Sequence, residues 1–241
     1  RDKEEITFVK HLQEKFGNFY LVPEGGTNEL AIKGCEEILT NNDSKFHVIT
    51  CAVGTGGTIA GIAKTFPNAR LGVIWIDAHA DLHTPYTTPS GNLHGMPLAT
   101  ALGIDNKACQ INEVDEETTS KWEQLKSTGI DRAKLLPENL VFIAVRDTEP
   151  EENHLIDEFG LTNITVDQLR EMGVEQVVKS VLGKLKNCDL IYVSFDVDSM
   201  DPELTSHGTG TPVKHGLSPE EAAGLLEGFS AVEKTCCVEF V

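Results

Sequence analysis

The sequence predicts an α/β protein with three layers, in which helices cover both faces of a mostly parallel sheet. Apolar runs of strand length alternate along the chain with amphipathic stretches of helix length, and this alternation is typical of parallel sheets. The runs LGVIWI and LIYVSF are almost continuously apolar, as strands buried on both faces must be. A chain of 241 residues suits one such domain, so we expect residues 1–241 to fold together.

The elements follow from the local periodicity of the chain. Two helix starts carry capping signals: Thr27 precedes the helical pattern at Asn28, and Ser218 is followed by a proline and two glutamates. The stretch 103–136 is polar and weakly periodic apart from 121–126, so we interpret it as a long surface excursion. Strands are expected at 18–23, 46–53, 71–77, 139–145, 163–166, 189–195 and 235–241, and helices at 28–39, 58–66, 151–159, 174–185 and 219–229.

The composition argues against several classes of protein. The 20 basic and 38 acidic residues give a net charge of −18, whereas nucleic acids and anionic membranes require clustered positive charge. No apolar run reaches the length of a membrane helix, and the charged start RDKEEITFVK does not resemble a signal peptide. The six cysteines show no CxxC spacing, which favours reduced core residues in a cytoplasmic protein. A small-molecule partner is therefore expected, and a homo-oligomer remains an open option.

Carboxylates follow two of the expected strands. LGVIWI leads into DAHAD, which contributes Asp77, His79 and Asp81, and LIYVSF leads into DVD, which contributes Asp196 and Asp198. Alternate residues of an extended backbone share one face, so the side chains of each group can converge just past the strand end. In parallel sheets, function gathers at this edge.

These groups predict a metal site. Carboxylates gathered in one cleft repel one another, and a divalent cation is the usual remedy. Oxygen donors with a single imidazole suit Mn²⁺ or Mg²⁺ better than Zn²⁺ or Cu²⁺. Asp77 and Asp196 could each bridge two ions, an arrangement that activates water for hydrolysis. The alternative is that strand-end aspartates only cap helices or form turns.

A glycine-flanked loop follows the first of these groups. The segment PSGNLHGMP contains Ser90, Asn92 and His94. A single histidine in such a loop is more often structural or exposed. Close to a metal site that activates water, however, His94 becomes a candidate proton shuttle.

Three motifs together closely resemble the arginase (ureohydrolase) family over about residues 65–241. They are WIDAHADLHTPYTTPSGNLHGMPLATAL, SFDVDSMDPE and GTGTPV. The resemblance implies an arginase-like fold and a binuclear manganese enzyme that hydrolyses the guanidinium group of L-arginine to ornithine and urea. It implies that His94 and Asp81 are catalytic, and that the metal ligands are Asp77, His79, Asp81, Asp196 and Asp198.

The same resemblance implies a binding site for the backbone of an amino acid. His83 stands where commoner arginases carry Asn, and with Ser90 and Asn92 it would face the α-carboxylate. Glu149 and Glu152 would meet the α-amino group, and Thr211 would line the guanidinium side. Two anchors for an amino-acid backbone favour arginine over agmatine.

The first third of the chain has a different resemblance. The segment NFYLVPEGGTNELAIKGCEEI and the loop after the strand at 46–53 resemble the D-cysteine desulfhydrase and aminocyclopropane-carboxylate deaminase family over about residues 16–62. Those enzymes use pyridoxal phosphate, but neither Lys33 nor Lys64 matches their Schiff-base lysine, so we do not expect pyridoxal phosphate to bind. A glycine-rich turn that opens a helix can still cradle a phosphate. The candidate phosphate-binding residues are Gly54, Thr55, Gly56, Gly57 and Thr58.

Three functional hypotheses follow. The first is a manganese-dependent arginase-like hydrolase, with activity weakened because two family features are missing: a metal-ligating histidine after the strand at 46–53, and a guanidinium-binding glutamate placed by register beyond Val241. The second is an inactive chimeric or designed α/β scaffold, in which a segment 1–64 joins an arginase-like segment 65–241. The third is phosphate or pyridoxal phosphate binding through the loop at 54–58 alone. In the first case we expect two manganese ions, one of them loosely held.

Overall fold

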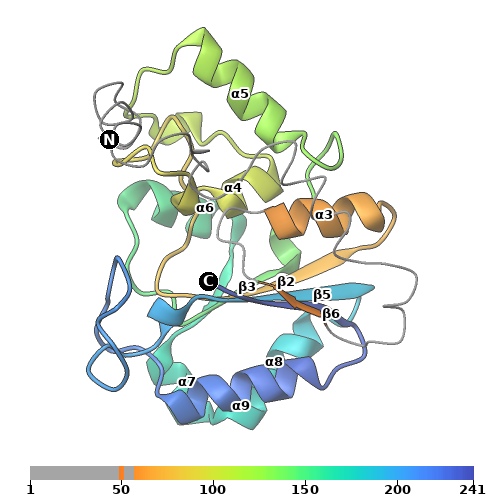
Figure 1. Cartoon of the computed structure of the whole chain (residues 1–241), viewed down its shortest axis with the longest axis vertical. Helices are drawn as coiled ribbons and strands as arrows, with labels where there is room; N and C mark the ends of the chain where they lie inside the picture. Colours follow the sequence, from red (N-terminus) through yellow and green to blue (C-terminus); the bar gives the residue numbers. More distant parts are fainter. Residues whose placement is uncertain (1–48, 52–56) are drawn as a thin grey trace, which may run out of the picture.

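The computed structural model describes residues 49–51 and 57–241 (Figure 1). The expected strand at 18–23 and the expected helix at 28–39 lie outside the described residues. In the remaining chain, the predicted strands and helices are found together with three further α-helices, at Pro97–Leu102, Glu116–Lys126 and Val166–Met172. The fold class is confirmed.

The described strands form one sheet in which every pairing is parallel. The strand order is β1-β6-β5-β2-β3-β4. Both central strands, β2 and β5, are buried along almost their whole length, as their apolar sequences require. The strands are β1 (Ile49–Cys51), β2 (Leu71–Ile76), β3 (Leu140–Ile143), β4 (Thr162–Ile164), β5 (Leu190–Phe195) and β6 (Thr235–Phe240).

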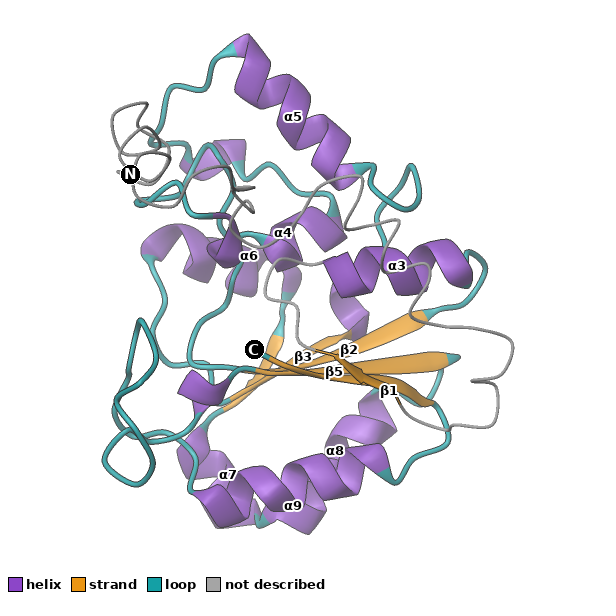
Figure 2. Ribbon diagram, viewed as in Figure 1, coloured by secondary structure: helices purple, strands orange, loops and turns teal. Residues whose placement is uncertain are grey.

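Helices cover both faces of this sheet, which gives the predicted three layers (Figure 2). One face is covered by α3 (Gly57–Thr65), α4 (Pro97–Leu102) and α6 (Pro150–Phe159), with α5 (Glu116–Lys126) farther out beyond α4. The opposite face is covered by α7 (Val166–Met172), α8 (Val174–Lys184) and α9 (Pro219–Ser230). Among the described residues, no helix is long and apolar enough to cross a membrane.

The structure corrects three local predictions. The segment 103–136 is not a plain excursion, because α5 forms a regular helix capped by Asp115; its single buried residue, Trp122, leaves no apolar stripe to detect. The strand expected at 163–166 ends at Ile164, because Thr165 caps α7. Helix α4 went unpredicted because all six of its residues are buried, so its sequence PLATAL shows no polar face.

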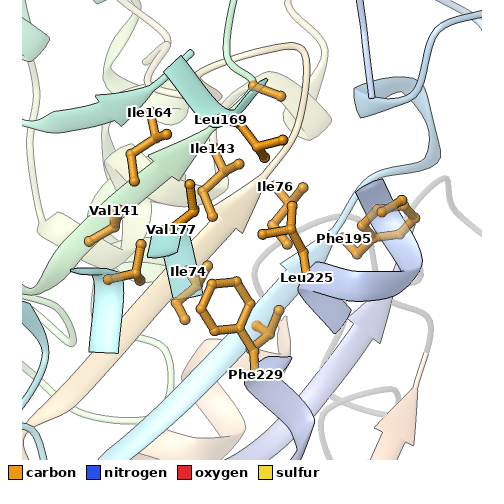
Figure 3. Packing of buried hydrophobic residues seen from close by; sticks show 14 of the residues in the cluster. Ile74, Ile76, Val141, Ile143, Ile164, Leu169, Val177, Phe195, Leu225 and Phe229 are labelled. Atoms are coloured by element: carbon orange, nitrogen blue, oxygen red, sulfur yellow. The ribbon is translucent and has the colours of Figure 1, made fainter. Parts of the chain in front are cut away.

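The two faces of the sheet bury separate sets of side chains. Ile74 and Ile76 of β2 pack against α7, α8 and α9, whereas the intervening Val73 and Trp75 pack on the side of α3 and α4. This alternation is the two-residue period of a strand that is covered on both sides. Figure 3 shows the first cluster, where Phe229 of α9 lies against Ile74 and Leu225.

Phe229→Ala is expected to destabilise the protein strongly. The Phe229 ring is fully buried, so its removal leaves a cavity and should lower the free energy of unfolding by about 3–5 kcal/mol. Urea unfolding followed by circular dichroism measures this change. The matched control is Phe66→Ala, because that ring is 46% exposed and should change the free energy of unfolding much less. Equal effects of the two substitutions would contradict this description of the core.

Candidate active site

The site lies where the order of strands in the sheet reverses. From β2 the chain adds β3 and then β4 on one side, and it returns to add β5 and β6 on the other side. The connections that leave β2 and β5 therefore diverge, and a crevice opens at the carboxyl ends of these two neighbouring strands. Asp77 directly follows β2, and Asp196 directly follows β5.

A cavity of about 890 Å³ occupies this crevice. Its walls come from the segments that follow β2, β3 and β5, and Val241 adds the segment after β6. Every predicted ligand, shuttle and substrate-binding residue lines it. These are Asp77, His79, Asp81, His83, Ser90, Asn92, His94, Glu149, Glu152, Asp196, Asp198 and Thr211.

The two aspartate motifs fold into similar turns. One oxygen of Asp77 accepts the backbone N–H of His79 at 2.8 Å, and one oxygen of Asp196 accepts that of Asp198 at 2.9 Å. One oxygen of each carboxylate therefore stabilises the turn in which it lies. A further bond joins the two turns, since the Ala78 N–H donates to Asp198 Oδ1 at 3.2 Å.

Asp77, His79 and Asp198 bring three donor atoms within 4.8 Å of one another. His79 Nδ1 lies 3.1 Å from Asp198 Oδ2 and 3.5 Å from Asp77 Oδ1. Burial by itself would lower the pKa of His79, but its hydrogen bonds to Asp198 and Asp77 outweigh burial and raise that pKa to about 11. In the absence of a cation, the imidazole thus supplies a positive charge between the two carboxylates.

The neighbouring carboxylates repel one another. Burial, followed by repulsion from Asp77 and Asp198, raises the pKa of Asp196 to about 8. Burial also raises the pKa of Asp77 to about 6, and that of Asp81 well above its ordinary value. Asp81 adopts a left-handed backbone conformation with φ of 51°, a strained position for a residue with a side chain. Several acidic oxygens are therefore packed where they resist ionisation, which is the situation that a divalent cation relieves.

A second group of donor atoms lies beside the first. His83 Nε2 is 3.1 Å from Glu149 Oε2 and 3.7 Å from Glu152 Oε2. The two glutamates form a capping box at the start of α6, and Glu152 also accepts the Leu82 N–H at 3.0 Å. Burial, followed by the neighbouring Glu149, raises the pKa of Glu152 to about 8. Glu152 is thus buried and held by two backbone N–H groups, whereas the half-exposed Glu149 contacts His83, and both acids line the cavity.

The remaining predicted residues lie toward the mouth of the cavity. Ser90, Asn92 and His94 are exposed on the loop before α4. Thr211 comes from the loop at 201–217, and its hydroxyl donates to Asp198 Oδ2 at 3.1 Å. The imidazole of His94 and the hydroxyl of Thr211 thus both line the cavity.

Two acidic residues near this site were not among the predicted site residues. Asp147 lines the cavity, with Oδ2 at 3.7 Å from His79 Nε2. Its signal was available, because it follows β3 as the other aspartates follow β2 and β5. Glu239 lies on β6, is buried, and accepts a hydrogen bond from Tyr192. The register places Glu239 beside Ser194, and Ser194 beside Trp75, which lines the cavity.

The predicted phosphate loop is only partly described. Gly57 and Thr58 are the first residues of α3. Gly54, Thr55 and Gly56 lie outside the described residues, as does the end of the strand expected at 46–53, where the family histidine would stand.

The parallel sheet and the acidic cavity at its switch point define an α/β protein with a cleft suited to a cation. The family model that matches the chain, over residues 53–241, is that of the arginase family. The chain belongs to the arginase family.

Individual relatives agree with this assignment. The chain is 33% identical to the arginase of Entamoeba histolytica over 186 residues, covering 77% of this chain and 56% of that protein. It is 32% identical to the arginase of Brevibacillus brevis, covering 96% of this chain and 76% of that one. The crystal structure of the Entamoeba arginase with L-ornithine superposes with a TM-score of 0.66 over 77% of this chain and 57% of that one. For the arginase of Bacillus cereus the TM-score is 0.71, at 31% identity, over 88% and 67%. The chain thus spans little more than half of the Entamoeba protein.

These comparisons do not support the chimera. The match to the arginase family begins at residue 53, and so includes α3 and residues 53–56 before it, which had been assigned to the second resemblance. The alignment with the Brevibacillus protein extends over 96% of the chain. Glycine-rich sequences between a strand and a helix are common in α/β folds, so the sequence at 54–58 does not identify a family by itself.

The metal-free protein is expected to lose stability as pH rises. The pKa values of Asp77 and Asp196 are raised from 3.8 to about 6 and about 8, so their contribution is present below pH 4 and is lost as pH rises through these values. The raised pKa of His79 acts in the same direction above pH 6.5. Asp198, with a lowered pKa, opposes them only at acid pH. We expect the Tm of chelated protein to fall by roughly 5 °C between pH 6 and pH 8.

Differential scanning calorimetry after chelation measures this change. Added Mn²⁺ should reverse the fall at pH 8, because a cation favours the ionised carboxylates. Asp196→Asn, which removes one titrating acid, should show a shallower dependence on pH. A Tm of chelated protein that rises from pH 6 to pH 8 would contradict the described electrostatics.

Proposed function

We propose that the protein is a manganese-dependent hydrolase that cleaves the guanidinium group of L-arginine to give ornithine and urea. The observation that carries the proposal is the convergence of two groups of side chains at the switch point of the sheet. One group suits cations, and the other suits the polar end of an amino acid. The first comprises Asp77, His79, Asp81, Asp196 and Asp198, and the second His83, Glu149 and Glu152.

The donors of the first group fit manganese. Four carboxylates and one imidazole are a hard, oxygen-rich set. We assign Asp77 and Asp196, at the ends of adjacent strands, as residues that would hold the ions, together with His79, Asp81 and Asp198. When bound, the two ions lower the pKa of a water molecule and so supply the nucleophile.

The second group suits the α-amino end of the substrate. Glu152 is held by two backbone N–H groups, and the half-exposed Glu149 lies beside it at the start of α6, so the pair can receive an ammonium group. We assign His83, Ser90 and Asn92 to the α-carboxylate. His83 would then lie between the α-carboxylate and the α-amino group of the substrate, since its Nε2 is 3.1 Å from Glu149 Oε2. These anchors recognise groups that agmatine only partly has, which favours arginine.

The guanidinium side is assigned to Thr211 and Glu239. By sequence register alone, the guanidinium-binding glutamate was expected beyond Val241. In the sheet, however, Glu239 shares a row with Ser194 and Trp75, and alternation along the strands puts this row on the same face as the residue after β2. We therefore propose Glu239 for the role that sequence register had left without a residue.

His94 is assigned as the group that moves a proton between the cavity and solvent. It is exposed at the cavity mouth, so its ring nitrogens can exchange protons with water. An imidazole can accept a proton at one ring nitrogen and donate one from the other, which suits this task. In its protonated form, the ring can donate a proton to the leaving amine as ornithine forms.

Assays with manganese test this function. Protein purified with Mn²⁺ should release urea from L-arginine, at a rate that rises with added Mn²⁺ and is much lower with agmatine. One of the two ions should be lost on mild chelation, because the family resemblance implies a second histidine ligand that the sequence lacks. Among the described residues, the Asp77 group contains one histidine, His79. Losing a neighbouring group weakens metal sites by roughly 10–100-fold, and losing a ligand should cost at least that. Metal content measured by mass spectrometry checks this. Protein that takes up no Mn²⁺ and releases no urea would favour an inactive scaffold.

A further inference from the structure

We propose that Arg146 is a positioning residue, which fixes the loop at 201–217 over the cavity against the turn that carries Asp198. The effect of Arg146 on metal binding and turnover rests on the proposed function. The effect of Arg146 on the position of the loop is independent of that function. The hydrogen bonds of one guanidinium group carry this inference.

Arg146 lies in the segment that follows β3, and its half-buried guanidinium donates to four backbone carbonyls. Nη2 donates to Asp198 O at 3.0 Å and to Val213 O at 2.7 Å. Nε donates to Lys214 O at 3.0 Å, and Nη1 to Ala144 O at 3.0 Å. One side chain thus connects the end of β3, the turn after β5, and the loop over the cavity.

The base of this loop is closed by its own backbone. Asp201 N donates to Leu217 O at 2.9 Å, and Leu217 N donates to Ser199 O at 2.9 Å. Gly216 packs so closely that an added Cβ would lie 2.4 Å from the Met200 carbonyl carbon. These contacts fix where the loop begins and ends. They do not fix its far part, which lines the cavity between positions 205 and 211.

Side chains also tie the loop to the rest of the described chain. Thr211, at the end of the cavity-lining part, donates to Asp198 Oδ2 at 3.1 Å, and Arg146 donates to the carbonyls of Val213 and Lys214 just beyond that part. Arg170 donates to Gly216 O at 3.0 Å, at the base of the loop. Arg146 and Thr211 thus both tie the loop to Asp198, one through its backbone and the other through its carboxylate. Movement of the loop would therefore move a proposed metal ligand as well.

Arginine suits this position better than lysine. A planar guanidinium offers five N–H groups in a fixed fork, whereas an ammonium offers three donors at one point and cannot reach carbonyls on three segments. Burial lowers the pKa of Arg146, and the attraction of nearby carboxylates for its positive charge opposes this effect. These carboxylates are those of Asp198, Asp201, Asp77 and Asp147. Arg146 therefore gives both geometry and charge compensation to the acidic turns.

Amide hydrogen exchange on the metal-free full chain tests the proposal. In Arg146→Met, exchange in peptides covering 201–217 should quicken by about ten-fold or more, because the loop loses its link to β3 and the Asp198 turn. Arg146→Lys should give a smaller increase. The control is Arg132→Met, which removes another arginine that donates to a backbone carbonyl, that of Pro67, away from this loop. It should leave peptides 201–217 unchanged.

Calorimetric titration with Mn²⁺ supplies the second measurement. Manganese affinity should fall by roughly 10–100-fold in Arg146→Met, less in Arg146→Lys, and not at all in Arg132→Met. Unchanged exchange at 201–217 in Arg146→Met would overturn the proposal. If Arg146→Met does not fold, unchanged exchange in Arg146→Lys would overturn it. A wild-type chain that binds no Mn²⁺ contradicts the proposed function, while the exchange measurement still decides the role of Arg146.

Discussion

Asp196→Asn should abolish urea release and weaken manganese binding at least about a hundred-fold. Asparagine keeps the shape of the side chain and one oxygen, but it removes the negative charge of a carboxylate that we propose would hold the metal. Loss of a group that only supports a ligand already costs roughly 10–100-fold in affinity, so loss of a ligand itself should cost more. Metal content after dialysis and urea release from L-arginine measure the two effects.

The matched control is Asp131→Asn, which changes an exposed aspartate on the loop between α5 and β3. It should leave both measurements unchanged. The backbone turn after β5 should survive in Asp196→Asn, because an amide oxygen can still accept the Asp198 N–H. Normal manganese content in the folded variant would therefore rule out Asp196 as a ligand.

His94→Asn should lower kcat by about 10²–10⁴-fold while leaving manganese binding unchanged. This range is typical for loss of a general acid or base. We expect kcat to fall without loss of metal, because His94 lies at the exposed mouth of the cavity and belongs to neither group of clustered donor atoms. Steady-state kinetics and metal content on the same preparation measure both quantities.

An exposed histidine elsewhere provides the control for this substitution. His154 lies on α6 with Glu158 at 3.5 Å, and His154→Asn should leave kcat unchanged. Added imidazole should partly restore turnover in His94→Asn, since a small buffer can replace a proton carrier that is open to solvent. Loss of manganese from His94→Asn would show that the residue supports the metal site instead.

The strand ends could be predicted because their signal is local. The apolar runs LGVIWI and LIYVSF mark buried strands, and the aspartates that follow them must emerge at one edge of a parallel sheet. Predicting that Asp77 and Asp196 lie side by side also requires the order of the strands in the sheet. That order was implied by the family resemblance.

Other features depend on contacts that the sequence does not display. The place of Glu239 is set by the pairing of β6 with β5, including a register shift between Ile191 and Tyr192, and no local pattern encodes that pairing. Helix α5 was missed because it buries only Trp122. The role proposed for Arg146 involves carbonyl groups, which every residue has, so no sequence pattern marks its partners.

The bond between Ala78 and Asp198 joins positions 120 residues apart in the chain. Contacts of such sequence separation form slowly, because a long loop must close before they contribute to stability. A cation held by both turns would find its donors side by side only in the native state. Its binding would therefore stabilise the native state by RT ln(1 + [L]/Kd). The concentration of manganese around the protein would then change the stability of the folded chain as well as its metal content.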